Sequence, residues 1–111
     1  MELDDRNSQH RDLKAKIIAH CENPNEVRIT HTALQDLGLG GITKHEVLAV
    51  IQEHIRLGRA IFAAQMDSGE MAYVVKECNV AAAILYVKVK FFKHERKELM
   101  LLMSSHPPRK W

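Results

Sequence analysis

Apolar side chains in the first half of the chain recur at helical spacing. Over residues 11–22 they fall on one side of about three helical turns, so we predict a first helix there, ended by Pro24. A short second helix is expected over residues 33–37, with Thr30 or Thr32 as its N-cap.

The third predicted helix has the clearest boundaries. Thr43 and Glu46 form a capping box, in which the threonine oxygen accepts a hydrogen bond from the Glu46 N–H and the glutamate reaches back to the Thr43 N–H. The amphipathic run 47–55 follows, and Gly58 is a natural residue to end this helix.

After Gly58 the apolar period changes to the alternation of strands. We predict strands at Ala60–Met66, Met71–Lys76, Val80–Phe92 and Glu98–Ser105, with turns at Asp67–Gly69, Glu77–Asn79 and His94–Lys97. Val27–Ile29 is expected to be a short extended segment. Helices followed by strands predict an α+β fold, with two to three N-terminal helices packed on one face of a roughly four-stranded antiparallel sheet.

The longest predicted strand has two different faces. Its apolar residues are expected to meet the third helix in the core, with Leu85, Val87, Val89 and Phe91 against Val47, Val50, Ile51 and Ile55. The other face of the sheet is then partly open, and it carries Tyr86, Lys88 and Lys90.

The composition is that of one globular domain. The chain has 111 residues, of which 46% are apolar and 27% charged, so we expect a single domain over residues 1–111 with flexible segments at 1–9 and 107–111. No apolar run reaches the roughly 18 residues of a membrane span, and the acidic start does not resemble a signal peptide. Cys21 and Cys78 are expected to be free thiols, which favours a cytoplasmic location.

Charge is distributed unevenly along the chain. Residues 1–26 hold six acids and four bases, for a net charge of −2, whereas residues 76–111 hold eight bases and three acids, for +5. A basic C-terminal third suggests an anionic partner such as nucleic acid, although basic surfaces are also common without that role.

The sequence offers no recognisable motif for a metal or a cofactor. Its seven histidines form no H-x-x-x-H pair, and neither cysteine has a partner at C-x-x-C spacing. A G-x-S-x-G nucleophile elbow and a phosphate-binding glycine loop are also absent. We therefore expect no metal and no cofactor.

The open face predicted above has residue types that suit RNA. Lysines contact phosphates, and a tyrosine ring stacks on a base. The same groups suit metal-independent cleavage, in which a base takes the 2′-OH proton, a cation stabilises the charged phosphate and an acid protonates the leaving 5′-oxygen. His106 is suited to acid or base work because histidine titrates near pH ~6.5. A solvated strand face with lysines for solubility explains the same pattern without any function.

Several segments occur in an order known from one protein family. They are Val27-Arg28-Ile29-Thr30-His31-Thr32-Ala33-Leu34, Leu37-Gly38-Leu39, Val50-Ile51, Phe62-Ala63-Ala64-Gln65-Met66, Tyr86-Val87-Lys88-Val89 and Leu101-Leu102-Met103-Ser104-Ser105-His106. Over residues 11–106 the chain therefore resembles the MqsR family of toxin mRNA interferases, within the RelE-like ribonuclease superfamily.

The resemblance implies a sequence-selective, metal-independent endoribonuclease that a cognate antitoxin protein neutralises. The catalytic tyrosine of the family matches Tyr86, and a lysine of its last strand falls at His106; with Lys88 these form the predicted catalytic set. The predicted RNA-binding residues are Lys76, Tyr73, Lys90, Arg109 and Lys110.

Two positions depart from the family pattern. The lysine of F-x-K-S-M falls at Ala64, and the glutamine of W-Q-D-V-Y falls near Tyr73. Because alanine cannot hold a phosphate, either Lys76 or Lys88 replaces the missing cation from a neighbouring strand, or catalysis is weakened or lost.

The expected partners are mRNA and a cognate antitoxin protein, and a homodimer is left open. One alternative is a non-catalytic relative of the same fold that binds RNA or a partner protein. Another is an unrelated interaction module, or a self-associating protein that uses its sheet edge or the apolar segment Val80-Ala81-Ala82-Ala83.

Overall fold

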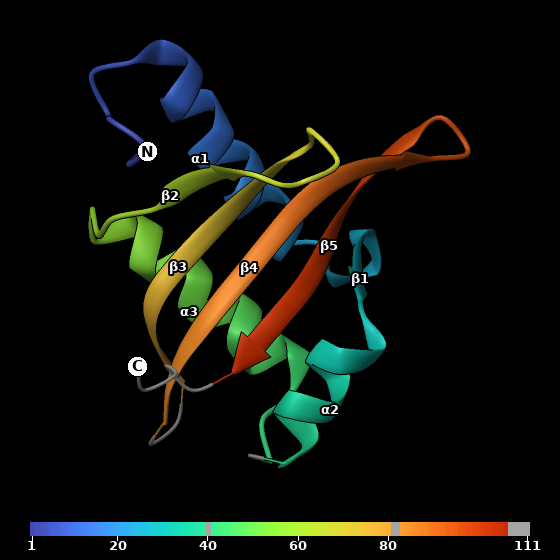
Figure 1. Ribbon diagram of the computed structural model, residues 1–111. Coiled ribbons are helices and arrows are strands. Elements are labelled where there is room, and N and C mark those ends of the chain that lie inside the picture. The colour runs from blue at the N-terminus through green and yellow to red at the C-terminus, as the bar shows by residue number, and fades with distance from the viewer. Residues whose placement is uncertain (40, 81–82, 107–111) are drawn as a thin grey trace.

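The computed structural model describes residues 1–39, 41–80 and 83–106, and it places the helices before the long strands (Figure 1). The helices are α1 (Ser8–Cys21), α2 (His31–Leu39) and α3 (Lys44–Arg56), with a short 3-10 helix at Pro24–Glu26. The strands are β1 (Val27–Ile29), β2 (Phe62–Gln65), β3 (Met71–Val80), β4 (Ala83–His94) and β5 (Lys97–His106). The predicted α+β class is confirmed.

Side-chain caps fix where the helices begin. The Asn7 side chain accepts hydrogen bonds from two backbone N–H groups of the first turn, so α1 begins three residues earlier than the apolar spacing predicts. At α2 the Thr30 hydroxyl accepts from the Ala33 N–H at 3.1 Å, which selects Thr30 over Thr32 as the cap. The capping box of Thr43 and Glu46 is present at α3, as predicted.

The end of α3 is a Schellman motif. Gly58 has φ +74°, and its N–H donates to the Ile55 carbonyl, while the Arg59 N–H donates to the His54 carbonyl at 3.1 Å. A residue without Cβ adopts this left-handed conformation at little cost, which explains why glycine stands here.

The sheet has five strands, in the order β1-β5-β4-β3-β2. Strands β2 to β5 are antiparallel neighbours, but β1 pairs parallel to β5, with Val27 opposite Met100. The prediction of about four antiparallel strands therefore needs correction. The expected extended segment at Val27–Ile29 is a fifth strand, and it makes the sheet mixed.

The predicted turn at Glu77–Asn79 is wrong, because β3 continues through it to Val80. The strand accommodates these polar residues with a bulge between Val75 and Cys78. The β4–β5 pair has a second irregularity, between Lys88 and Val89. Its turn lies at Glu95 and Arg96, which have φ of 52° and 66°.

The first residues of the chain pair with β2. The Leu3 N–H donates to the Ile61 carbonyl at 2.7 Å, Glu2 forms an antiparallel bridge with Phe62, and Leu3 is 3% exposed. The expectation of flexibility over residues 1–9 is therefore wrong for residues 1–3, while the other expected flexible segment, 107–111, lies outside the described residues.

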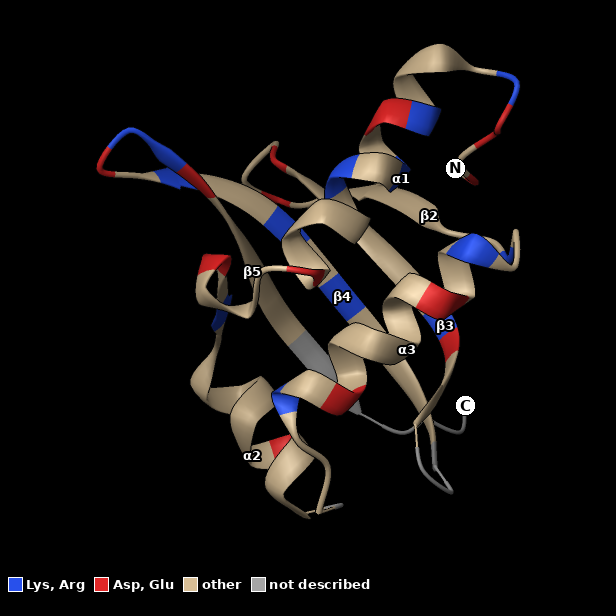
Figure 2. Cartoon of the chain, turned by 180° about the vertical axis from the view of Figure 1, so that it is seen from behind, with Lys and Arg blue, Asp and Glu red and all other residues tan. Residues whose placement is uncertain are grey.

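The helices and one face of the sheet enclose the core. Figure 2, which views the molecule from behind, shows α1 and α3 in front of the strands. The residues of α3 and β4 that were predicted to be in the core belong to one buried cluster, which contains Val47, Ile51 and Ile55 together with Leu85, Val87 and Val89. Val50 and Phe91 pack against that cluster.

Candidate functional site

The face of the sheet opposite the core is not covered by any described helix (Figure 1). Strand alternation and register place on it Phe62, Val74, Lys76, Tyr86, Lys88, Lys90, Phe92 and Leu101. We call this surface the open face. It combines lysines with aromatic and aliphatic side chains, as the sequence predicted for Tyr86, Lys88 and Lys90.

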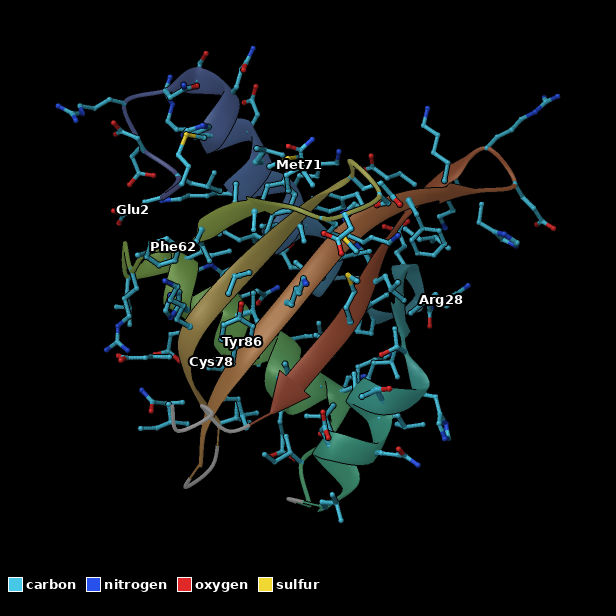
Figure 3. All side chains as sticks on the ribbon, in the orientation of Figure 1. Glu2, Arg28, Phe62, Met71, Cys78 and Tyr86 are labelled. Carbon is cyan, nitrogen blue, oxygen red and sulfur yellow. The ribbon has the colours of Figure 1, made fainter. Side chains whose placement is uncertain are left out.

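Tyr86 lies in β4 on the open face, where Figure 3 labels it. Its sequence neighbours Leu85 and Val87 are buried in the core, whereas Tyr86 itself is half-buried. In the β4–β5 register Tyr86 stands directly opposite His106. Residues opposite each other in an antiparallel pair share a face and have Cβ atoms about 5 Å apart. The two predicted acid–base residues therefore occupy neighbouring positions; the structure describes the backbone of His106 but not its side chain.

The β3 bulge brings charged residues to the other side of Tyr86. Between the register pairs Val75–Val87 and Cys78–Leu85, both Lys76 and Glu77 stand opposite this one tyrosine. Both side chains are exposed. Bulges next to functional sites commonly re-aim side chains in this way. Sequence reasoning placed Glu77 in a turn and so missed that it lies beside the predicted site.

An aromatic ring positions Lys76. Its Nζ lies 4.3 Å from the centre of the Phe62 ring in β2. Cation–π contacts of this kind contribute about 0.5–1 kcal/mol at exposed sites. The contact holds the ammonium group on the open face instead of leaving it fully mobile in solvent.

Lys88 occupies the next row of the sheet, between Val74 on β3 and Ser104 on β5. The second bulge follows immediately: Lys88 pairs with Ser104 and Val89 with Leu102, so Met103 has no partner on β4. Lys88 is half-buried among these strands. Lys88 therefore lies in the row of the open face next to that of Tyr86 and Lys76.

Lys90 is already paired with an acid. Its Nζ lies 3.1 Å from Glu70 Oε2, and its side chain is 18% exposed. The hydrogen bond and the charge of Lys90 hold the pKa of the Glu70 carboxyl below its ordinary value. Lys90 must therefore leave or share this partner before it can bind a phosphate, so it is a weaker candidate than Lys76 or Lys88.

Tyr73 is not on the open face, so its assignment as an RNA-binding residue is corrected. It is 9% exposed in the core, with its ring centre 5.9 Å from that of Phe91. Tyr73 faces the core because residues opposite each other in the sheet share a face, and its register partner Val89 faces the helices. The other two predicted RNA-binding residues, Arg109 and Lys110, lie outside the described part of the chain.

Ala64 stands at the position where the family pattern has a lysine, and a second alanine lies opposite it on the neighbouring strand. Ala64 on β2 is directly opposite Ala72 on β3, and the next residue across the sheet in this row is Lys90. Ala64 is exposed, whereas Ala72 is fully buried. Neither alanine can donate a hydrogen bond to a phosphate, and Lys90 in the same row is already paired with Glu70.

The described residues include no cluster of histidine, cysteine or acidic side chains that could hold a metal ion. Burial raises the pKa of the Cys21 thiol to about 12 and that of the Cys78 thiol to about 11. Both thiols are therefore protonated near neutral pH and unsuited to act as nucleophiles. Within the same part of the chain, no helix has the length and apolar character that crossing a membrane requires.

Comparisons of the chain with known protein families, with curated proteins and with solved structures find no match. The function is therefore inferred from the residues of the open face.

Proposed function

We propose that the open face binds single-stranded mRNA and that the chain is a metal-independent, toxin-like endoribonuclease. The observation that carries this proposal is the register of Tyr86 opposite His106, with Lys76 in the bulge on the other side of Tyr86. These residues are far apart in the sequence. Their assembly in one row of an uncovered sheet face is what a phosphodiester site made only of side chains requires.

In the proposed reaction the ribose 2′-oxygen attacks the adjacent phosphorus. A base removes the 2′-OH proton, the bond from phosphorus to the 5′-oxygen breaks, and an acid protonates that oxygen. The products are a 2′,3′-cyclic phosphate and a free 5′-OH. Tyr86 and His106 take the two proton-transfer roles, while Lys88 and Lys76 stabilise the charge on the phosphate.

The chain layout supports an MqsR-like and RelE-like assignment. In that assignment Tyr86-Val87-Lys88-Val89 is the family strand with the catalytic tyrosine. The assignment carries with it a cognate antitoxin protein as partner and action in the cytoplasm.

The test is cleavage of a long mRNA by purified protein in EDTA, with mapping of the new ends. Wild type is expected to produce discrete cuts that leave 2′,3′-cyclic phosphates, whereas Tyr86→Phe and His106→Ala are expected to abolish them. Phe92→Leu, which changes another aromatic residue of the open face, serves as the matched control. Unchanged cleavage by the Tyr86 and His106 variants would refute this placement of the catalytic groups.

A non-catalytic RNA-binding relative is the second candidate, and the pair of Ala64 and Ala72 favours it. The remaining cation of that row, Lys90, is already paired with Glu70, so the open face can hold RNA through its lysines and yet stabilise the transition state poorly. RNA binding without cuts in the same assay, also in the presence of translating ribosomes, would favour this candidate. Absence of both binding and cuts would favour a protein-interaction module.

A further inference from the structure

A cavity of about 460 Å³ opens where the end of α3 meets β2 and β3. It is lined by His54, Arg59, Ala60, Phe62, Lys76 and Glu77. Cavities of this size accommodate small ligands or parts of larger ones. The lining has two cationic side chains, one carboxylate and one aromatic ring, so it is net positive and offers both charged and apolar contacts.

The Schellman motif of α3 builds one wall of the cavity. Gly58 turns the chain out of the helix, and the Arg59 N–H is held by the His54 carbonyl. His54 is 7% exposed, and its Nε2 donates to the Ala60 carbonyl at 2.9 Å. These bonds fix the backbone that presents Arg59, whose own side chain is exposed.

The opposite wall is continuous with the open face. Lys76 and Glu77 line the cavity, and they are also the two bulge residues that stand opposite Tyr86. Strand β2 pairs with β3 only as far as Val74, so it does not cover this bulge. Neighbouring strands are about 4.8 Å apart, so the cavity begins one strand away from the row of Tyr86 and His106.

We propose that this cavity is a subsite for a nucleotide that flanks the two nucleotides joined by the cleaved bond. Arg59 binds the phosphate of this nucleotide through its guanidinium group, while Lys76, which lies between the cavity and Tyr86, remains with the phosphate that is cleaved. Glu77 accepts a hydrogen bond from the exocyclic amino group of the base, which uracil lacks, so the subsite prefers an amino-bearing base to uracil. This inference rests on the proposed function and adds a specificity-determining pair, Arg59 and Glu77, to it.

The experiment measures binding of non-cleavable 2′-O-methyl oligonucleotides by competition against a fluorescent RNA. A dinucleotide covers only the cleaved position, whereas a tetranucleotide extends it by one nucleotide on each side. Arg59→Gln is expected to weaken binding of the tetranucleotide more than binding of the dinucleotide. It should also reduce the slope of log K against log salt by about 0.7, the contribution of one phosphate contact on a single strand.

Glu77→Gln is expected to remove the preference for an amino-bearing base over uracil at one flanking position, with little change in the salt slope. Arg96→Gln is the matched control, since it removes the same charge from the β4–β5 turn, which projects away from the cavity (Figure 1). That variant should bind both oligonucleotides as wild type does. Thermal unfolding of each variant verifies that the fold is retained.

The outcomes separate the two proposals. If wild type binds the tetranucleotide but Arg59→Gln and Glu77→Gln do not alter its affinity or base preference, the subsite is refuted while the open face stands. An equal loss of affinity for both oligonucleotides would also refute the subsite, because the substitution would then act at the cleaved position. If wild type binds neither oligonucleotide, the proposed function fails and the subsite fails with it.

Discussion

The Thr30 hydroxyl donates a 2.8 Å hydrogen bond to the carbonyl of Met103, the residue that bulges out of β5 next to Lys88. The same oxygen accepts from the Ala33 N–H as the cap of α2. One small side chain therefore ties the start of a helix to the part of β5 that leads to His106. These two hydrogen bonds explain structurally why a threonine stands at position 30, within the segment Val27–Leu34.

Replacing Thr30 with valine is predicted to remove both hydrogen bonds while keeping the side-chain shape. Loss of a cap and of a buried hydrogen bond should lower the free energy of unfolding by about 1–3 kcal/mol. Denaturant titration measures this change, and Thr30→Ser should restore most of it because it keeps the hydroxyl. If the Thr30→Val and Thr30→Ser variants are equally stable, the hydroxyl does not contribute to stability as predicted.

Glu70→Gln is predicted to strengthen RNA binding. The substitution removes the carboxylate that neutralises Lys90 and frees one ammonium group on the open face. The slope of log K against log salt should become steeper by about 0.7 for single-stranded RNA. Glu95→Gln at the distant β4–β5 turn is the control, and an equal effect there would mean that only net charge matters.

Ala64→Lys is predicted to give the open face the cation that the family pattern has at this position. Ala64 is exposed on β2, so a longer side chain has room. We expect tighter RNA binding with a salt slope steeper by about 0.7, and faster cleavage if wild type cleaves. Ala64→Met matches the length without the charge. An equal gain with methionine would assign the effect to apolar contact with bases.

The cysteines are predicted to react slowly with disulfide reagents in the native protein at pH 8. Their pKa values of about 12 and about 11 leave almost no thiolate at that pH, and both side chains are buried. Denaturant should make both thiols reactive, because their pKa values return to the ordinary range near 8.5 in the unfolded chain. Rapid labelling of the native protein would contradict the described burial.

Local signals explain what the sequence could predict. The Thr43–Glu46 capping box and the alternation of β4 depend on residues close together in the chain, and both appear in the structure as predicted. The three residues of β1 offer no such signal. Their strand character comes from a partner at Met100–Leu102, which no local pattern reveals.

The errors around β3 also have a physical cause. Four consecutive residues of β3 are buried, namely Ala72, Tyr73, Val74 and Val75. The alternation of apolar and polar side chains therefore does not show which of them face the helices and which face the open face. The polar run that follows has the composition of a turn, but the bulge absorbs it within the strand. The composition therefore predicts a turn at Glu77, while Tyr73, which the family resemblance places among the RNA-binding residues, lies in the core. By contrast, the clean alternation around Tyr86 placed it correctly on the open face.

The parallel pairing of β1 with β5 has a consequence for the order in which the protein becomes functional. A chain is synthesised from its N-terminus, so β1 has no partner until β5 has left the ribosome. Strand β5 also supplies His106. The emergence of β5 therefore completes both the sheet and the proposed site. A nascent chain that ends before β5 can form its helices and the β2–β3 hairpin, yet it lacks His106 and the strand that completes the proposed site.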